Sequence, residues 1–192
     1  MGGQRDTKAR IERAALRLFV EKGVASTSIR DIAAAIGLSD GALYRHYASK
    51  DELIWTLFSA GFTAFAGALD RRAATQNGTR RKIAAMAEEF CRLYDEDSVL
   101  FRFILLVQHD QLQRVRPGMA NPVESVRGVI ADGMARGEIP AGNADLATAM
   151  VMGIILQPAT FKVYGRIEQP LSDLAPTLST ACWKALRVNQ KG

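Results

Sequence analysis

Cysteine is scarce in this chain, whose 192 residues include only Cys91 and Cys182, far apart in the sequence. Two distant cysteines do not form the disulfide framework of a small secreted domain. We interpret each as a small buried hydrophobic residue in a reducing cytosol. A redox switch between the two is the alternative interpretation.

Long apolar runs are also missing. The first residues, MGGQRDTKAR, contain no apolar signal core, and no apolar run reaches the roughly 20 residues that a transmembrane helix needs. We therefore expect a soluble, cytoplasmic protein with no membrane partner.

The usual groupings of catalytic and metal-binding residues are absent as well. The sequence contains two histidines, and we find no glycine-rich phosphate loop, no paired acids and no nucleophile spaced to meet a base. The neighbours His109 and Asp110 do not form a metal site, because adjacent residues of a helix point to different faces. These absences indicate a protein that is not an enzyme and that holds neither a cofactor nor a metal ion.

The residues that are present suit a helical core. Hydrophobic residues make up 48% of the chain and charged residues 23%, which allows a substantial core. Apolar residues recur at helical spacing, while neither strand-like alternation nor an internal repeat is found. We predict an all-α fold of about nine helices.

Positive charge is concentrated at the N-terminal end. Residues 1–50 hold nine Lys and Arg against five Asp and Glu, so +4 of the net charge of +5 lies there. A basic head on a near-neutral body is typical of a nucleic-acid-binding protein with a separate second domain. We predict a DNA-binding domain over residues 1–52 and an effector-binding and dimerisation domain over residues 53–192.

Residues 26–53, STSIRDIAAAIGLSDGALYRHYASKDEL, carry the most informative pattern. An apolar face at the spacing i, i+3, i+4 and i+7 predicts a short helix, formed by Ile29, Ile32, Ala33 and Ile36. Gly37 ends this helix in a left-handed turn, and Ser39 caps the next. Two short helices joined by a glycine turn make a helix-turn-helix.

The second of these helices, about residues 40–46, would read DNA. Tyr44 offers a hydroxyl or a ring, Arg45 suits guanine or phosphate, and His46 suits phosphate. Ser49 and Glu52 form a capping box that starts a third helix, and Lys50 in its first turn suits a phosphate. The residues predicted to contact DNA are Thr27, Ser28, Arg30, Ser39, Asp40, Gly41, Ala42, Tyr44, Arg45, His46 and Lys50. Arg5 and Lys8 are weaker candidates. The alternative is that this region is only a packing unit with a solvated basic surface.

This stretch resembles the DNA-binding domain of the TetR (tetracycline-repressor) family, which typically shows T-x-x-x-I-A-x-x-x-G-(V/L)-S-x-(G/P)-x-L-Y-x-H-(F/Y)-x-x-K-x-x-L. The residues that fall on or near this pattern are Ser28, Ile32, Ala33, Gly37, Leu38, Ser39, Gly41, Leu43, Tyr44, His46, Tyr47, Lys50 and Leu53. The resemblance covers about residues 7–53, and nothing beyond residue 60 matches a motif. It implies a transcriptional regulator with a three-helix DNA-binding domain and a divergent helical domain that binds a small effector.

The remaining helices are expected from periodicity and caps. The first runs from about Thr7 to Lys22, after a loose arm over residues 1–6. The helix opened by Ser49 continues to about Arg72, so it joins head to body as a lever. A helix from Ser98 is apolar nearly all round over Val99–Val107, which predicts burial on several sides. The other helices are expected over about 83–97, 122–136, 144–161 and 172–188, with Pro158 kinking or ending the fourth of them near Phe161.

Phenylalanine and methionine are frequent in the body, where they suit either a plain core or a mostly apolar cavity. The resemblance favours a cavity for a small effector. Its predicted lining is Phe62, Phe65, Met86, Phe90, Tyr94, Phe103, Met119 and Met150, with polar groups from Gln108, His109 and Gln157.

The last two helices, rich in small and apolar residues, suit pairing with a second copy. In the resembled family these helices form a four-helix dimer interface, whereas ordinary intrachain packing is the alternative. We therefore predict a homodimer that binds double-stranded palindromic DNA, because two small heads match a palindrome. A DNA-organising protein without an effector is the competing function. The sequence does not identify the effector, the operator or the regulated genes, nor does it separate a repressor from an activator.

Overall fold

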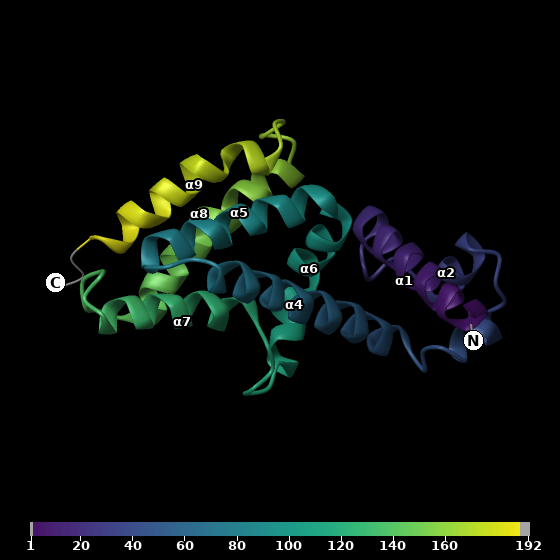
Figure 1. Cartoon of the computed structure of the whole chain (residues 1–192). Coiled ribbons are helices and arrows are strands. Elements are labelled where there is room, and N and C mark those ends of the chain that lie inside the picture. Colours follow the sequence, from purple (N-terminus) through teal and green to yellow (C-terminus); the bar gives the residue numbers. More distant parts are fainter. Residues whose placement is uncertain (1, 189–192) are drawn as a thin grey trace. The chain divides into compact units, whose positions relative to one another are not determined.

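The computed structural model describes residues 2–188, and the side chains of residues 6–188. Within this part of the chain nine α-helices and one 3₁₀ turn form the secondary structure, and no strand is found (Figure 1). The elements are α1 (Gly2–Lys22), α2 (Ile29–Ala35), α3 (Asp40–Tyr44), α4 (Lys50–Ala74), α5 (Thr79–Glu96), α6 (Ser98–Gln111), η1 (Leu112–Arg114), α7 (Pro122–Ala135), α8 (Ala144–Val163) and α9 (Leu171–Leu186). The predicted all-α fold of about nine helices is confirmed.

The chain folds into two compact units. The first contains the residues up to 61 together with 99–117, and the second contains 62–98 together with the residues from 118 onward. Helix α4 therefore begins in one unit and ends in the other. The functional boundary predicted between residues 52 and 53 lies within α4 and stays a prediction.

The core of the first unit is built on α1. Ile11, Ala15 and Phe19 are fully buried on one face of this helix, as their spacing predicts. The ring of Phe19 stacks on that of Phe103 from α6, with 5.7 Å between the ring centroids. Segments more than 80 residues apart in the chain therefore share one core.

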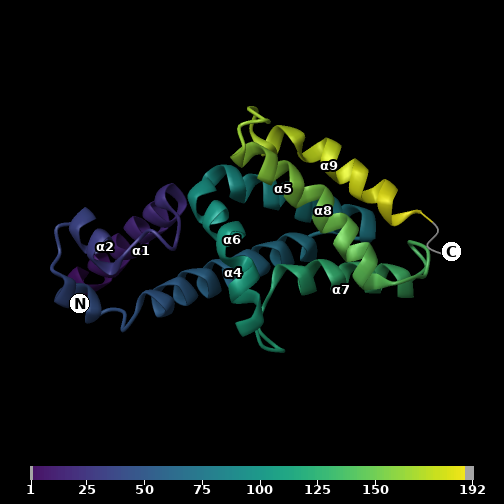
Figure 2. The ribbon, with the colours of Figure 1, turned by 180° about the vertical axis from the view of Figure 1, so that it is seen from behind.

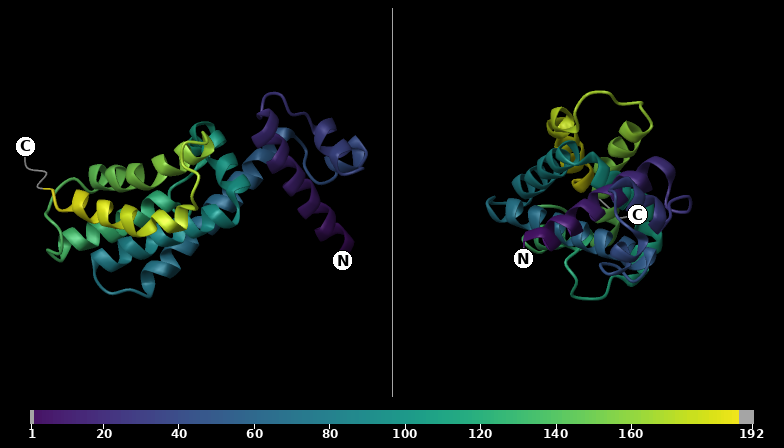
Figure 3. Two further views of the ribbon diagram at one scale, coloured as in Figure 1. Left: turned by 90° about the horizontal axis from the view of Figure 1, so that it is seen from above. Right: turned by 90° about the vertical axis from the view of Figure 1, so that its right-hand side faces the viewer.

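In the second unit, α5 packs against α9 and α7, and α8 packs against α7 and α9. Figure 1 shows α9 lying along α5, and Figure 2 shows α8 beside α9 from behind. The left view of Figure 3 shows that α8 and α9 run next to each other in opposite directions. Their packing places the two C-terminal helices at one side of this unit.

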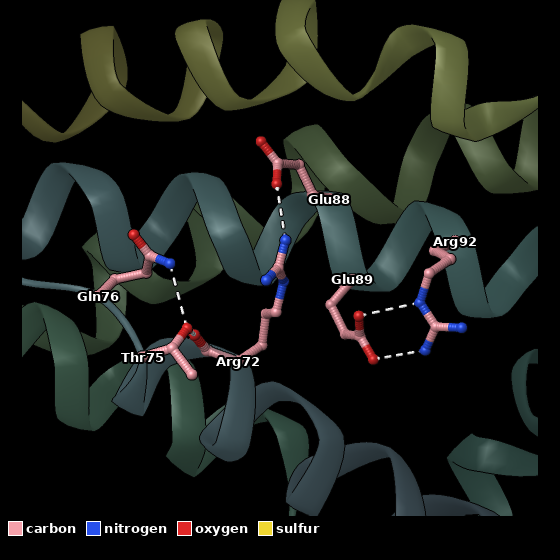
Figure 4. Close-up of polar contacts among 6 residues, drawn as sticks. All are labelled: Arg72, Thr75, Gln76, Glu88, Glu89 and Arg92. Atoms are coloured by element: carbon pink, nitrogen blue, oxygen red, sulfur yellow. Dashed lines mark hydrogen bonds and ion pairs between the residues drawn. The ribbon is translucent and has the colours of Figure 1, made fainter.

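A charged pair joins the last turn of α4 to α5 (Figure 4): Arg72 lies 3.4 Å from the Glu88 carboxylate. Within α5, the Arg92 guanidinium binds both carboxylate oxygens of Glu89. Thr75, just after α4, donates its hydroxyl to the carbonyl of Arg72. Exposed ion pairs contribute little stability individually, so the pair of Arg72 and Glu88 adds little to the packing of the two helices.

Local caps appear where the sequence predicts them. Asn121 accepts from the backbone N–H of Glu124 with Pro122 at the first helical position, and Asn143 accepts from Asp145 and Leu146. At Ser49 the box is altered: Ser49 accepts from the Glu52 N–H, but the Glu52 carboxylate accepts from Ala48.

Two helices of the second unit are capped from elsewhere in the chain. Asp95, at the end of α5, accepts from the backbone N–H groups of Leu171 and Ser172 at 3.0 and 2.9 Å, and from the Ser172 hydroxyl at 2.7 Å. Burial raises the pKa of this carboxyl, but these hydrogen bonds outweigh the effect and hold the pKa below its usual range. Glu138 likewise accepts from the first N–H of α5, at Thr79. That bond, with the Arg136 guanidinium, lowers the pKa of Glu138 to about 2.

One expectation about the helices is corrected. Helix α1 begins at Gly2, so residues 2–6 are helical rather than a loose arm, because no proline interrupts residues 2–6 and most of them tolerate helix. Helix α6 buries Phe101, Phe103 and Val107, in line with the expected burial on several sides, while the side chain of Leu106 is 51% exposed. Helix α8 contains Pro158 and ends at Val163, two residues beyond the expected end near Phe161.

Two helices, α4 and α8, are long and apolar enough to cross a membrane by length and composition alone. The expectation that no segment reaches this length therefore needs that qualification. Buried core helices of soluble proteins meet the same criterion, and both helices contribute buried residues to the units described above.

Both cysteines are buried and unpaired. Burial raises the pKa of the Cys91 thiol to about 11 and that of Cys182 to about 12. Thiols of this kind react slowly, which supports the interpretation of both as core residues.

Candidate nucleic-acid interface

The segment between α1 and α2 is fixed by polar contacts. Ser28 caps α2, accepting from the Asp31 N–H at 3.1 Å, while the Asp31 carboxylate accepts from the Ser28 N–H at 2.7 Å. The Ser28 hydroxyl and then its backbone N–H lower the pKa of Asp31. This capping box was not among the predicted features, although the spacing Ser-x-x-Asp signals it.

The turn between α2 and α3 forms as predicted. Gly37 has a φ of +69°, a left-handed conformation that glycine adopts without strain. The N–H of Leu38 returns to the carbonyl of Ala33 at 2.9 Å, which closes the end of α2. Ser39 then caps α3 by accepting from the Ala42 N–H at 3.3 Å.

The faces of the recognition segment are divided as the sequence predicts. Leu43 and Tyr47 are buried, while Gly41, Tyr44 and Arg45 are exposed. The side chain of Tyr44 is 53% exposed. Tyr44 ends α3 and Arg45 is its C-cap, so an exposed aromatic and an exposed arginine are available to a partner on a segment anchored by two buried residues.

Tyr47 also ties this segment to α1. Its hydroxyl donates to the Glu12 carboxylate at 2.6 Å, and the Lys8 ammonium lies 5.9 Å from the Tyr47 ring centroid. Burial, followed by the bond to Glu12, raises the pKa of Tyr47. This link was not predicted, because Glu12 and Tyr47 are 35 residues apart and no local pattern joins them.

Lys50 lies at the start of α4 as predicted, but it already has protein partners. Its ammonium donates to the carbonyl oxygens of Val24 and Thr27, at 2.9 and 3.1 Å. An ammonium has three N–H donors, so one remains for a phosphate. Lys50 therefore holds the loop between α1 and α2, a structural role that the sequence analysis did not foresee.

Thr27 was predicted to contact DNA, but its side chain is buried. Its side chain is 1% exposed, and its hydroxyl donates to the carbonyls of Gly23 and Leu18 at 2.8 and 3.2 Å. A threonine hydroxyl has one hydrogen to donate, and here it is used inside the head. Thr27 thus supports the loop instead of presenting a side chain to a ligand.

The other predicted contacts remain accessible to different degrees. The exposed ones are Ser28, Arg30, Ser39, Gly41, Tyr44 and Arg45, and the partly exposed ones are Asp40, Ala42, His46 and Lys50. Lys8 is exposed as well, whereas the side chain of Arg5 lies outside the described residues.

Several of these residues meet at one groove of the first unit. This open groove of about 390 Å³ lies between the segment from Ala25 to Arg30 and the side chains of Tyr44 and Lys50. It brings together hydroxyl, guanidinium and ammonium groups, all of which donate hydrogen bonds to phosphate oxygens. The geometry therefore suits an anionic partner such as a nucleic-acid backbone.

An ion pair lies across the surface formed by α2 and α3. The Arg30 Nε donates to the Asp40 Oδ2 at 3.0 Å, and the two side chains are 85% and 43% exposed. The pair therefore stands in solvent, where both groups are accessible to a partner.

The residues predicted to line an effector cavity are divided between the units. In the second unit, Phe62, Phe65, Met86, Phe90 and Tyr94 are each at most 9% exposed. The rings of Phe65 and Phe90 meet edge to face, 5.6 Å apart. Met119 and Met150 are partly exposed.

The predicted polar groups are placed differently. Gln157 of the second unit and His109 of the first are exposed, and Gln108 of the first is partly exposed. Phe103 belongs to the core of the first unit. Exposed side chains do not line an enclosed cavity inside their own unit, so the prediction is not supported for Gln157 and His109.

Comparison with known proteins gives matches to the N-terminal region and to most of the chain. Residues 11–55 match the model of the family described as "Bacterial regulatory proteins, tetR family". The chain is 30% identical over 175 residues to the HTH-type transcriptional regulator TcmR of Streptomyces glaucescens, a match that covers 85% of this chain and 71% of TcmR. It is 46% identical over 52 residues to the HTH-type transcriptional repressor Rv3405c of Mycobacterium tuberculosis, covering 27% of this chain and 28% of that protein.

Solved structures share the fold over nearly the whole chain. The TetR family transcriptional regulator PfmR of Thermus thermophilus superposes with a TM-score of 0.75 at 22% identity, covering 95% of this chain and 100% of PfmR. The transcriptional regulator FadR of Bacillus subtilis, in complex with stearoyl-CoA, gives a TM-score of 0.74 at 19% identity, covering 91% of this chain and 96% of FadR.

Proposed function

This chain belongs to the TetR family of bacterial transcriptional regulators, and we propose that it is a repressor whose homodimer binds palindromic operator DNA and is released by a small, mostly apolar effector. The relatives reported above are named as regulators, and one as a repressor. The observation that carries the DNA-binding part is the exposed face of α3 beside a groove rich in hydrogen-bond donors. The proposal includes a cytoplasmic location, where bacterial operator DNA lies.

Base and phosphate contacts have different sources on this surface. Gly41, Tyr44 and Arg45 on the exposed side of the recognition segment suit base edges in the major groove. Ser28, Lys50 and the groove between them suit the phosphate backbone, which fixes the register of the head on the duplex. Thr27 has no direct part in this assignment.

The outer surface of the two C-terminal helices suits a dimer interface. Exposed residues recur every three or four positions along α8, in the order Leu146, Ala149, Gly153, Gln157, Phe161 and Tyr164. Leu146, Phe161 and Tyr164 are large apolar or aromatic side chains, 51%, 39% and 68% exposed. On α9, Thr177, Thr180 and Ala181 line a shallow depression of about 470 Å³.

Small residues let the backbones of two copies approach closely. A Cβ at Gly153 would have no atom within 4 Å, so the room beside this glycine is open to a partner helix. A two-fold axis would set each copy of the stripe against the other copy. Two heads arranged by such an axis match half-sites about 34 Å apart along the duplex.

The buried aromatic cluster of the second unit is where we place the effector. Phe62 and Phe65 lie on α4, the same helix whose first residue is Lys50. A ligand that displaces these rings must move α4, and with it the loop that Lys50 holds. A coupling of about 1–3 kcal/mol would weaken DNA binding about 5- to 150-fold. FadR of Bacillus subtilis, which has this fold, carries stearoyl-CoA, so a long-chain acyl thioester is a rational first probe.

The central experiment measures oligomeric state and DNA binding together. We expect sedimentation to show a dimer and titration of a selected palindrome to give one dimer per site. A monomer that binds a half-site as tightly as the palindrome would contradict the proposal. Replacement of Gly153 by Arg should dissociate the dimer, because this glycine lies in the proposed interface. Gly128→Arg on α7 is the matched control: both glycines have open space beside them, but Gly128 lies outside the proposed interface, so this variant should stay dimeric.

A DNA-organising protein without an effector is the second candidate function. The close contact of Phe65 with Phe90 favours it, because touching rings leave a solid core at that point. Affinity for acyl ligands distinguishes the two functions. A ligand that binds with and without operator equally well would support the second candidate, since linkage requires reciprocal effects.

A further inference from the structure

The ion pair between Arg30 and Asp40 has no evident role in stability. Both side chains stand largely in solvent, and exposed ion pairs of this kind contribute little to folding. A carboxylate on this surface also opposes DNA binding, because it repels phosphates. We therefore look for the role of this ion pair in DNA binding.

The contact with Asp40 uses only the Nε of Arg30 and leaves its two terminal Nη groups available to a base. Asp40 takes the Nε hydrogen, and in the described part of the chain no other partner of Arg30 is found. The two Nη groups, with four N–H donors between them, remain available. A guanidinium held at Nε keeps its planar fork in one orientation and loses less conformational freedom when it binds.

We propose that Asp40 is a positioning residue that holds Arg30 for bidentate recognition of guanine in the major groove. Arg30 lies on α2, and its bond to Asp40, the first residue of α3, holds it beside the recognition segment that was assigned to base contacts. An arginine fork matches the O6 and N7 acceptors of guanine, the commonest specific contact to a base. This inference rests on the proposed DNA-binding function and assigns part of its sequence preference.

Two other arrangements give different results. If Arg30 contacts a phosphate, its loss weakens all sequences alike and reduces the salt dependence. If Asp40 itself accepts from a cytosine amino group, it acts independently of Arg30. A double-mutant cycle separates these cases from the proposed one.

The experiment selects duplexes from a random pool with full-length protein, for the wild type, R30A, D40A, D40N and the double variant R30A/D40A. We expect each wild-type half-site to contain a G·C pair preferred about 5- to 150-fold, and R30A to lose this preference. D40A should lose it as well, while its affinity for non-specific DNA rises at low salt because a negative charge is gone. D40N keeps an oxygen acceptor for Nε, so it should retain most of the preference.

The double variant should discriminate no worse than R30A, because Asp40 acts only through Arg30. R17A is the matched control: it removes an exposed arginine of α1 that has no part in the proposed contacts with DNA, and should leave this G·C preference in place. Circular dichroism and thermal unfolding verify that every variant folds.

The inference fails if D40A keeps the full guanine preference, if the losses in R30A and D40A add, or if R30A weakens all duplexes equally. A wild-type protein that selects no consensus would instead contradict the proposed function itself. The two failures are therefore distinguishable in one data set.

Discussion

Replacing Lys50 by methionine tests whether this residue serves the loop, the DNA or both. Methionine keeps the apolar stem and removes the ammonium that donates to the carbonyls of Val24 and Thr27. Hydrogen bonds to charged groups contribute about 1.5–3 kcal/mol each. Since these carbonyls are only partly buried, water replaces much of the loss, and we expect local opening to become about 1–2 kcal/mol easier.

Hydrogen exchange followed by mass spectrometry measures that opening. Amides of the loop around residues 23–28 should exchange about 5- to 30-fold faster in K50M, because 1.4 kcal/mol is a factor of ten in an opening equilibrium. In K22A, which removes an exposed lysine at the end of α1, loop exchange should stay near the wild-type rate.

DNA titration over a range of salt concentrations measures the second role. If the remaining N–H of Lys50 meets a phosphate, K50M lowers the slope of log affinity against log salt by about 0.9 per head, or about 1.8 for a dimer. Unchanged exchange in the loop would refute the structural role read from the two hydrogen bonds. A reduced slope together with altered base preference would refute the assignment of Lys50 to the backbone.

Three further predictions concern the caps and the recognition segment. Asp95→Ala should destabilise the protein by about 1–2 kcal/mol in urea unfolding, because three hydrogen bonds at the start of α9 are lost. Asp70→Ala on the exposed side of α4 is the control, and an equal loss of stability in the two variants would contradict the cap. Glu138 has a pKa lowered to about 2 from 4.5, so it contributes stability above pH 4.5 that is lost as the pH falls towards 2; Glu138→Gln should flatten the pH dependence of unfolding in that window, and an unchanged profile would count against it. Tyr44→Phe should weaken operator binding less than Tyr44→Ala, because phenylalanine keeps the exposed ring; equal losses in a binding titration would assign the contact to the hydroxyl.

The parts of the fold that follow from neighbouring residues were predictable from the sequence. Gly37 and Ser39 predict the helix-turn-helix because a left-handed turn and an N-cap each depend on neighbouring residues alone. The apolar spacing on α1 and the cap at Asn121 are local in the same sense. Such signals extend over a few residues, so they can be recognised in the sequence without knowledge of the tertiary structure.

Contacts between distant segments were not predictable in this way. Asp95 caps a helix 76 residues later, and Glu138 caps one that begins 59 residues earlier. The acidic run at Asp95 looked only like the end of a helix, since nothing nearby names its partner. Burial of Thr27 was missed for a related reason: its hydroxyl contacts the carbonyls of Gly23 and of Leu18 on α1, and only the folded loop brings the second of these close.

The cap formed by Asp95 sets an order in which the chain can mature during synthesis. Asp95 is synthesised 76 residues before Leu171, and the donors that its carboxylate accepts from appear only when the first residues of α9 are made. The second unit also draws on two separate stretches of chain, 62–98 and 118 onward, so the first stretch must wait for the second. The first unit also combines two stretches, the residues up to 61 and 99–117, so its core waits for the later stretch that brings Phe103. A nascent chain that ends before Leu171 therefore lacks the helix that Asp95 caps, and its second unit stays incomplete.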